Sequence, residues 1–304
     1  MPEVTVSRVL THEQARALVG DDVALPYTPT LPRARPGDPV WVRDADTGAV
    51  IGIVTVLSDT DRARVRAAVL DINTALGVAR MNRKQKTNPK ARTFGWAPKR
   101  IVIQYEACHA TTMVRDHPAA HAVLSRLSLT LTNEFAALLP EQAAADQQTI
   151  TTIKGDWRME EGSLWTSGVV NDTALLPYHL DKQNLPTWSA MPSIRYGVDG
   201  GHLHLPEYDL VFPCRDGEVT WFLGRELVHG VTPMRKRRPD GYRFTVVYYA
   251  IAAMKNCATY AEETRAMTVR RTERERTMAE SARQRLIAEY ADTINAQGTM
   301  AADT

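Results

Sequence analysis

The feature that most constrains the fold is the stretch 149–253, in which short runs of β-favouring residues alternate with turn-forming residues. Glycine, proline and aspartate separate the runs, and many short strands with this punctuation are typical of a β-sandwich or a β-barrel. The strands are expected at 165–170, 193–198, 202–205, 210–212, 218–222 and 242–250. The sequence therefore predicts a β-rich core in the second half of the chain.

Hairpin and helical patterns precede and follow this core. A β-hairpin is expected over 40–57, and apolar residues that recur every three or four positions predict a helix over 61–78. A second helix is expected to begin at Pro118 and to end before Pro140. Dense Glu and Arg residues after Met254 predict a further helix with a largely solvated surface.

These patterns predict an α+β protein in three parts. They are an N-terminal mixed α/β extension with a basic loop (1–100), the β-rich core with a supporting helix (101–254) and a C-terminal helical extension (255–304). The chain has no run of about eighteen apolar residues, so we expect no membrane span. The N-terminal residues lack the basic-then-apolar pattern of a secretion signal, so a cytoplasmic location is expected.

Charge is distributed unevenly, although the formal net charge is only +2. Between Ile72 and Tyr105 the chain contains several basic residues and no acidic residue, and a second basic cluster lies at 235–238. Such asymmetry favours a polyanionic partner, although the first segment is also compatible with a solvated loop and the second with a simple strand connection. The residues expected to contact a DNA phosphate backbone are Arg83, Lys84, Lys86, Lys90 and Arg92.

Three residues of the core predict a metal site. His179 and Asp181 are two positions apart in a β-rich run, and residues i and i+2 of a strand face the same side. His229 follows in the apolar run 227–231. Two histidines and one carboxylate form the facial triad of non-haem Fe(II) oxygenases, which leaves coordination positions open for a chelating co-substrate and O₂. Zinc accepts the same ligands, so the triad alone does not decide the metal.

An arginine on the last strong β-run favours Fe(II) over zinc. The alternation of 242–248 places Arg243 and Thr245 on one face of a strand. An inward-facing arginine is unfavourable unless it meets an anion, and its guanidinium offers a two-pronged fork to a carboxylate. We therefore expect 2-oxoglutarate as co-substrate, with its keto-acid end on Fe(II) and its distal carboxylate on Arg243 and Thr245.

The motifs in this region are similar to those of a known family. They are H-x-D-x-x-N ending at Asn184, a Gly-Gly-x-Leu turn ending at Leu203, L-x-H-G-V-x-P around His229 and R-x-[ST] at Arg243. Together they resemble the TET/JBP family of Fe(II)/2-oxoglutarate-dependent DNA-base dioxygenases, most closely its compact bacteriophage and bacterial members. The resemblance implies a double-stranded β-helix (jelly-roll, cupin-like) core and activity in a bacterium or a phage-infected host cell.

The resemblance also implies a substrate and residues that recognise it. The expected substrate is DNA with a 5-methylpyrimidine, usually 5-methylcytosine, which is hydroxylated to 5-hydroxymethylcytosine. Asn184 would hydrogen-bond the target base and Tyr249 would stack on it. Two features depart from the family pattern: Ile251 stands where animal members carry a base-contacting histidine, and their cysteine-rich zinc region is absent. A phage origin would place a DNA-hypermodifying enzyme downstream.

Other interpretations remain open at this point. The chain could be a 2-oxoglutarate dioxygenase acting on a small molecule or a protein side chain, or a non-catalytic nucleic-acid-binding module. Asn184 could instead cap a turn, and Tyr249 could be a core aromatic residue. His202 and His204 also share one strand face, but we expect them to be structural and do not include them among the metal ligands.

Overall fold

The structure is a computed structural model that describes residues 2–24, 28–75, 90–99 and 107–300. The chain divides into two compact units, and each is described by itself. The first unit consists of Met1–Pro98 and Ala110–Cys257, and the second consists of Lys99–His109 and Ala258–Thr304. The three-part organisation expected from the sequence (1–100, 101–254 and 255–304) stays a prediction.

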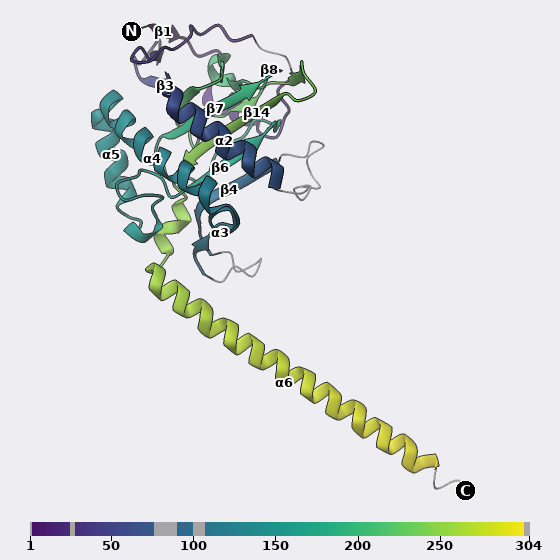
Figure 1. The fold of residues 1–304 in the computed structure, drawn as a ribbon. Coiled ribbons are helices and arrows are strands. Elements are labelled where there is room, and N and C mark those ends of the chain that lie inside the picture. Colours follow the sequence, from purple (N-terminus) through teal and green to yellow (C-terminus); the bar gives the residue numbers. More distant parts are fainter. Residues whose placement is uncertain (1, 25–27, 76–89, 100–106, 301–304) are drawn as a thin grey trace. The chain divides into compact units, whose positions relative to one another are not determined.

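A large, mostly antiparallel sheet forms the main layer, with the strand order β1-β2-β3-β11-β7-β14-β6-β4-β5 (Figure 1). β1 and β2 are parallel, and β14 pairs antiparallel with both β7 and β6. The strands of this sheet are β1 (Glu3–Val6), β2 (Val40–Asp44), β3 (Val50–Val56), β4 (Lys90–Ala97), β5 (His109–Ala110), β6 (Ser167–Asp172), β7 (Ser189–Tyr196), β11 (Glu218–Phe222) and β14 (Tyr242–Tyr249).

A smaller sheet has the order β10-β9-β12, and a separate hairpin pairs β13 with β8. Next to β12, the backbones of His179 and His229 exchange hydrogen bonds of 2.8 and 3.0 Å, which extends the antiparallel pairing by one more segment. The strands of these sheets are β8 (Val198–Gly200), β9 (Leu203–Leu205), β10 (Leu210–Phe212), β12 (Gly230–Val231) and β13 (Met234–Lys236).

The apolar core lies between the two sheets. Met191 and Phe222 of the main sheet belong to the same buried cluster as Leu205 and Phe212 of the smaller one. Burial of each such side chain stabilises the fold by roughly 1.5–3 kcal/mol. Gly52 allows this packing, because a Cβ at that position would lie 2.3 Å from the Phe212 ring. Two facing sheets around one core are the architecture of a double-stranded β-helix.

Helices of the first unit pack together beside the main sheet. α4 (Pro118–Leu138) has Pro at its first turn and packs against both α2 (Asp59–Ala75) and α5 (Pro140–Ile150). Phe135 of α4 stacks on Trp221 of β11, with ring centroids 5.5 Å apart. The remaining helical elements are α1 (His12–Ala17), α3 (Thr112–Asp116) and the 3-10 turns η2 (Gly155–Trp157), η3 (Pro206–Tyr208) and η4 (Ala252–Asn256).

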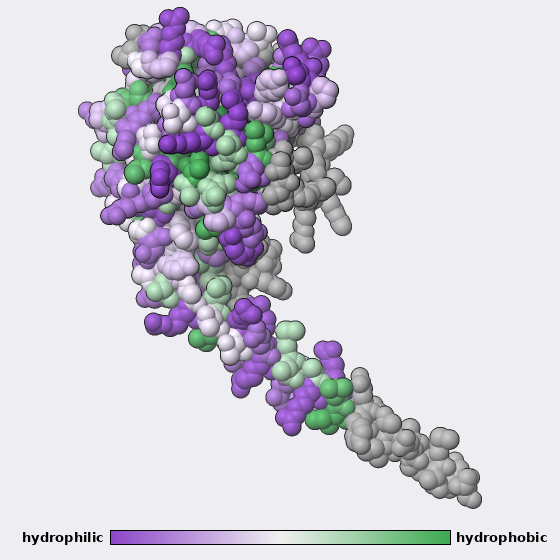
Figure 2. Space-filling view, in the orientation of Figure 1, coloured by the Kyte–Doolittle hydropathy of each residue, from purple (hydrophilic) through white to green (hydrophobic). Residues whose placement is uncertain are grey.

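The second unit contains the long helix α6 (Tyr260–Met300). Ion pairs along its surface, such as Arg271–Glu275 at 2.8 Å, support an exposed helix. Figure 2 shows mainly hydrophilic side chains on α6, with some apolar ones, and Leu286 and Ile287 are 66% and 59% exposed. Among the described helices, none is both long and apolar enough to cross a membrane.

The α+β class and the elements that flank the core are confirmed. The expected hairpin is β2–β3, the helix expected over 61–78 is α2, and the one expected from Pro118 is α4. Each of the six expected β-runs contains a strand. One expectation needs correction: Lys90 and Arg92 were assigned to a basic loop, but they lie in β4, which pairs with β6.

Candidate metal centre and co-substrate pocket

The smaller sheet brings the three predicted metal ligands together. His179 and His229 are direct partners in an antiparallel bridge, although fifty positions separate them in the chain. Asp181 follows two residues later and is fixed by a 2.9 Å hydrogen bond from its N–H to the carbonyl of Gly224. Backbone pairing therefore sets the spacing of the three side chains before any ligand is present.

The ligand atoms of these side chains converge. One donor atom from each of His179, Asp181 and His229 lies within 4.8 Å of the other two. Nε2 of His179 is 3.8 Å from Oδ1 of Asp181, and Nε2 of His229 is 3.9 Å from Oδ2 of the same carboxylate. The His229 side chain is 5% exposed, whereas those of His179 and Asp181 are 32% and 26% exposed. The cluster is thus open to solvent on one side.

Hydrogen bonds orient both imidazoles with Nε2 toward the cluster. Nδ1–H of His179 donates to the carbonyl of Pro177, and Nδ1–H of His229 donates to the carbonyl of Leu227, each at 2.8 Å. A carbonyl acceptor at Nδ1 leaves the Nε2 lone pair available for a metal. This is the arrangement that metal-binding histidines need.

The electrostatics of the cluster also fit a cation. Burial, with a smaller contribution from the neighbouring His179, lowers the pKa of His229 to about 3. Burial raises the pKa of Asp181, although His179 opposes that shift. A half-buried carboxylate beside the neutral His229 is stabilised by a positive charge, and a divalent metal ion would provide one. The three residues therefore fit Fe(II), although their chemistry alone also fits other divalent metals.

Gly224 contributes to the cluster through its missing side chain. A Cβ at this position would lie 2.6 Å from Oδ2 of Asp181, so even alanine would displace the carboxylate or the backbone beside it. Phe222 on β11 supports the other side, because its ring meets that of His229 edge to face with centroids 5.1 Å apart. Neither role could be predicted from the sequence, since both depend on contacts between distant segments.

A pocket of ≈120 Å³ extends from the cluster into the core between the two sheets. Its walls are mostly apolar and include Val169, Met191 and Val247. Besides the three predicted ligands, its polar lining residues are Asn171, Arg243, Thr245 and Tyr249. A mostly apolar cavity with a few polar groups is typical of a small-molecule site.

Arg243 supplies the one positively charged side chain among the pocket's lining residues. It is 1% exposed, and its Nε and Nη2 atoms have no hydrogen-bond partner among the described residues. Burial lowers the pKa of this guanidinium. Thr245 lies on the same face of β14 and is held by Asn171, whose Nδ2 is 3.5 Å from Oγ1 of Thr245. Unpaired donors on a buried cation indicate an anion that the protein itself does not provide.

The two residues expected to recognise a base occupy different surroundings. Tyr249 lines the pocket. Asn184 is 7% exposed and lies outside the pocket's lining residues. Its N–H donates to the carbonyl of Asp181 at 2.9 Å, and its own carbonyl accepts from Arg225. The backbone of Asn184 therefore belongs to a turn beside the metal ligands, and its role toward a base stays a prediction.

The residues expected to contact DNA phosphates are only partly described. Arg83, Lys84 and Lys86 lie outside the described residues. Lys90 and Arg92 both lie in β4, and the Arg92 side chain is half-buried. In the other basic cluster, 235–238, Arg235 is 3.5 Å from Asp199 and Arg238 is 3.2 Å from Asp240. These ion pairs reduce the charge that the second cluster presents.

The histidines left out of the metal site lie in other surroundings. Nδ1 of His204 is 2.6 Å from the Tyr178 hydroxyl, and its Nε2 is 3.1 Å from Oδ1 of Asp209. Burial lowers the pKa of His202 to about 4, and its position beside Arg195 and Arg243 adds to that shift. Neither histidine is among the pocket's lining residues.

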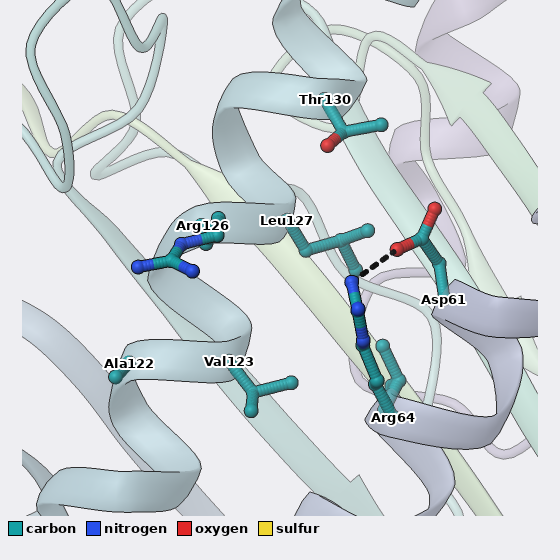
Figure 3. A pocket seen from close by; sticks show the side chains of 8 residues that line it. Asp61, Arg64, Ala122, Val123, Arg126, Leu127 and Thr130 are labelled. Carbon is teal, nitrogen blue, oxygen red and sulfur yellow. Dashed lines mark ion pairs between the residues drawn. The ribbon is translucent and has the colours of Figure 1, made fainter.

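A larger hollow of ≈320 Å³ lies between α2 and α4, away from this pocket (Figure 3). Its floor is apolar and includes Val65 and Leu127. Asp61 and Arg64 form an ion pair at 4.0 Å at its edge, and Arg126 comes from the opposite helix. The hollow has a single, paired carboxylate and no histidine among its lining residues, so it offers no metal site.

Comparison with solved structures identifies a similar fold. No family model matches the chain, and no curated protein matches it in sequence. Among solved structures it is similar to NgTET1 in complex with 5mC DNA, with a TM-score of 0.56 and 16% identity over 83% of this chain and 95% of that chain. This likeness concerns the fold alone, and it supports the double-stranded β-helix.

Two weaker structural likenesses add nothing to the fold assignment. An oxidoreductase of the 2OG-Fe(II) oxygenase family from Burkholderia pseudomallei has a TM-score of 0.43 and 12% identity over 82% of this chain and 95% of that chain. OsALKBH1 has a TM-score of 0.40 and 13% identity over 72% of this chain and 99% of that chain.

Proposed function

We propose that the protein is an Fe(II)- and 2-oxoglutarate-dependent dioxygenase that hydroxylates the 5-methyl group of 5-methylcytosine in DNA to 5-hydroxymethylcytosine. The observation that carries the proposal is the joint presence, in one pocket, of the His179, Asp181 and His229 cluster and the unpaired guanidinium of Arg243. The three metal-ligand side chains alone would fit many classes of enzyme. The buried guanidinium of Arg243 in the same pocket indicates that the co-substrate is an anion that can also bind the metal.

The three ligands and Arg243 would divide the work of binding. His179, Asp181 and His229 would hold Fe(II), and Arg243 with Thr245 would bind the distal carboxylate of 2-oxoglutarate. When bound, the metal supplies the oxidising power, using O₂ and converting 2-oxoglutarate to succinate and CO₂. The chain's own part is to orient the co-substrate, and its apolar pocket walls would exclude water.

The choice of a DNA base as substrate rests on the fold likeness and on the pocket's aromatic residue. NgTET1, whose fold this chain shares, is in complex with 5mC DNA. A base in duplex DNA would have to flip out to reach the metal, and Tyr249 offers a stacking face that would offset part of that cost. Asn184 would contact the base edge, and Lys90 and Arg92 would contact phosphates along with Arg83, Lys84 and Lys86.

The proposed setting follows from the proposed substrate. We place the enzyme in the cytoplasm of a bacterium or of a phage-infected host cell, where it would meet methylated DNA. A hydroxymethyl group on a base is a point of attachment for larger groups. A DNA-hypermodifying enzyme, such as one that transfers a sugar to the new hydroxyl, would therefore act next on the product.

Mass spectrometry of nucleosides tests this proposal. Methylated DNA is incubated with the protein, Fe(II), ascorbate and 2-oxoglutarate, and unmethylated DNA of the same sequence is the matched control. We expect 5-hydroxymethylcytosine to appear with an equivalent amount of succinate, only with methylated DNA. Succinate beside unchanged 5-methylcytosine would redirect the search to a small molecule or a protein side chain. No succinate in the presence of DNA binding would favour a non-catalytic module.

The stacking role of Tyr249 has its own test. Replacing it with leucine keeps an apolar side chain but removes the ring. We expect Tyr249→Leu to raise KM for methylated DNA by about tenfold, since stacking of one base contributes on the order of 1–3 kcal/mol. KM for 2-oxoglutarate should stay unchanged. An equal rise in both constants would show that the residue supports the pocket as a whole.

A further inference from the structure

Arg243 lies opposite a second arginine in the sheet. Arg195 on β7 is its direct cross-strand partner, so the two cationic side chains lie on the same face of adjacent strands. Arg195 lowers the pKa of Arg243, as expected for two like charges. Such a pair destabilises the fold unless each charge has a separate partner.

Arg195 has its own partners, and they are backbone carbonyls. Its Nη2 donates to the carbonyls of Val198 and Gly200, at 2.5 and 2.8 Å, and its Nη1 donates to the carbonyl of Cys214 at 3.2 Å. Burial lowers the pKa of Arg195, and nearby carboxylates, including Asp216, oppose that shift. Arg195 thus has three backbone acceptors, two in the segment that follows β7 and one at Cys214.

Arg243, in contrast, contacts a weak acceptor. The Cys214 side chain is buried and is a free thiol, and its backbone carbonyl accepts from Arg195. Burial lowers the pKa of Arg243, and Cys214, as a hydrogen-bond acceptor, opposes that shift. A thiol is a weak acceptor, so Cys214 does not satisfy the guanidinium of Arg243. Consistent with this, Nε and Nη2 of Arg243 keep no partner within the described part of the chain.

The glycine turn completes this arrangement. A Cβ on Gly201 would lie 2.6 Å from Sδ of Met234 and 3.2 Å from Cδ of Arg243, and its φ is +66°. Only glycine therefore allows the turn to lie this close to the stem of Arg243. Since Arg195 holds the carbonyl of Gly200, it also holds this turn in place.

We propose that Arg195 and Cys214 are positioning residues that keep Arg243 unsaturated for the distal carboxylate of the co-substrate. This inference rests on the proposed function and deepens it. Arg195 occupies the carbonyls that the neighbouring Arg243 would otherwise bind. Cys214 orients Arg243 with an acceptor too weak to compete with a carboxylate. A strong acceptor or an acid at position 214 would instead satisfy Arg243 and close the anion site.

The sharpest test changes the acceptor at position 214 without changing its size much. Cys214→Asp places a carboxylate beside Arg243, and Cys214→Asn is its matched neutral control. Cys214 has φ +45°, a conformation that Asp and Asn tolerate better than most residues. Binding is measured by calorimetry on the full chain loaded with Fe(II), without O₂, using 2-oxoglutarate and, in parallel, 2-oxobutyrate, which lacks the distal carboxylate.

We expect Cys214→Asp to weaken binding of 2-oxoglutarate by about 100-fold, because the new ion pair occupies the guanidinium. Cys214→Asn should stay within about threefold of the unaltered protein. Binding of 2-oxobutyrate should be equal in all three, a result that a general loss of structure would not give. The melting temperature of Cys214→Asp should be equal to or above that of Cys214→Asn, since Arg243 gains a partner.

Arg195→Met provides a second, independent variant. Freed carbonyls should let Arg243 turn toward them, which we expect to raise KM for 2-oxoglutarate by about tenfold while kcat at saturation is retained. Ser128→Ala is the control, since Ser128 is a buried polar residue of α4 outside the pocket. The inference is overturned if 2-oxoglutarate binds equally to the unaltered protein, to Cys214→Asp and to Arg195→Met. If the unaltered protein itself does not bind 2-oxoglutarate, the proposed function fails instead.

Discussion

The pocket has two polar regions, the ligand cluster of His179, Asp181 and His229 (the metal end) and Arg243 with Thr245 (the anion end). The two regions differ in their access to solvent, and the difference matches what each would bind. At the metal end, His179 and Asp181 are 32% and 26% exposed, whereas Arg243 at the other end is 1% exposed. A metal centre that must admit O₂ and a substrate needs an open side. A carboxylate anchor gains strength from exclusion of water, because charge-assisted hydrogen bonds are stronger in a low dielectric.

The two ends also differ in how their polar groups are satisfied without a ligand. At the metal end, Nδ1 of each histidine is bound to a carbonyl, and only the atoms that face the cluster lack a strong partner. At the other end, two of the three nitrogen atoms of the Arg243 guanidinium group have no partner among the described residues. The metal end is therefore preorganised by backbone pairing, whereas the anion end depends on the surrounding side chains.

Loss of a metal ligand should have the largest effect. Asp181→Ala removes the only carboxylate of the cluster, so the two remaining imidazoles cannot hold Fe(II) as a facial triad. We expect no detectable turnover and less than one metal ion per chain, measured as succinate release and by elemental analysis. Asp240→Ala, which removes an exposed carboxylate far along the chain, is the control. Full activity of Asp181→Ala would exclude this cluster as the metal site.

Removal of the Arg243 guanidinium should have the next largest effect, and it should leave metal binding unchanged. Arg243→Met keeps a long side chain but deletes the donors, so we expect KM for 2-oxoglutarate to rise by about 100-fold. Metal content should equal that of the unaltered protein, because Arg243 is not one of the three metal ligands. Joint loss of metal and co-substrate binding would show that the two ends are not independent.

Gly224→Ala tests how finely the metal end is positioned. Its added methyl group would lie 2.6 Å from Oδ2 of Asp181, so the carboxylate must shift. We expect metal affinity to fall about 10- to 100-fold, as for changes that disturb groups supporting a metal ligand. The measurement is a titration of metal-free protein with Fe(II) under anaerobic conditions. Gly155→Ala is the matched control, since a Cβ there would meet nothing within 4 Å; equal affinities in the two variants would contradict the expectation.

Part of this site could be predicted from the sequence alone. His179 with Asp181, and Arg243 with Thr245, follow from the two-residue period of a strand and from ligand chemistry, because both arguments are local. Gly224 and Cys214 could not be found in this way. Each acts through an approach to a residue about thirty to forty positions away in the chain, which only the folded structure shows.

The same distinction applies to the fold. The strands of the core were predictable because their runs are short, β-rich and bounded by turn residues. β4 was assigned to a loop because its basic residues resemble a solvated segment, and its partner β6 lies more than seventy positions away. Pairing with a distant strand, more than intrinsic propensity, makes Lys90–Ala97 a strand.

The smallest effect concerns the pH dependence of stability around the anion end. Burial lowers the pKa of His202 from 6.5 to about 4, and the charges of Arg195, Arg243 and Arg215 add to the shift. Because the folded-state pKa lies below that of the unfolded chain, the unfolded chain binds more protons between these values. The contribution of His202 is therefore fully present above pH 6.5 and is lost as the pH falls toward 4.

His202→Gln isolates that contribution, because glutamine keeps a polar side chain but does not titrate. We expect the urea midpoint of the unaltered protein to fall more steeply than that of His202→Gln between about pH 7 and about pH 5. The other histidines are common to both proteins, so they cancel in the difference. If the urea midpoints of the two proteins changed equally with pH, His202 would be protonated or solvated in the folded protein. The surroundings of the anion end would then be more exposed to solvent than the burial of Arg243 indicates.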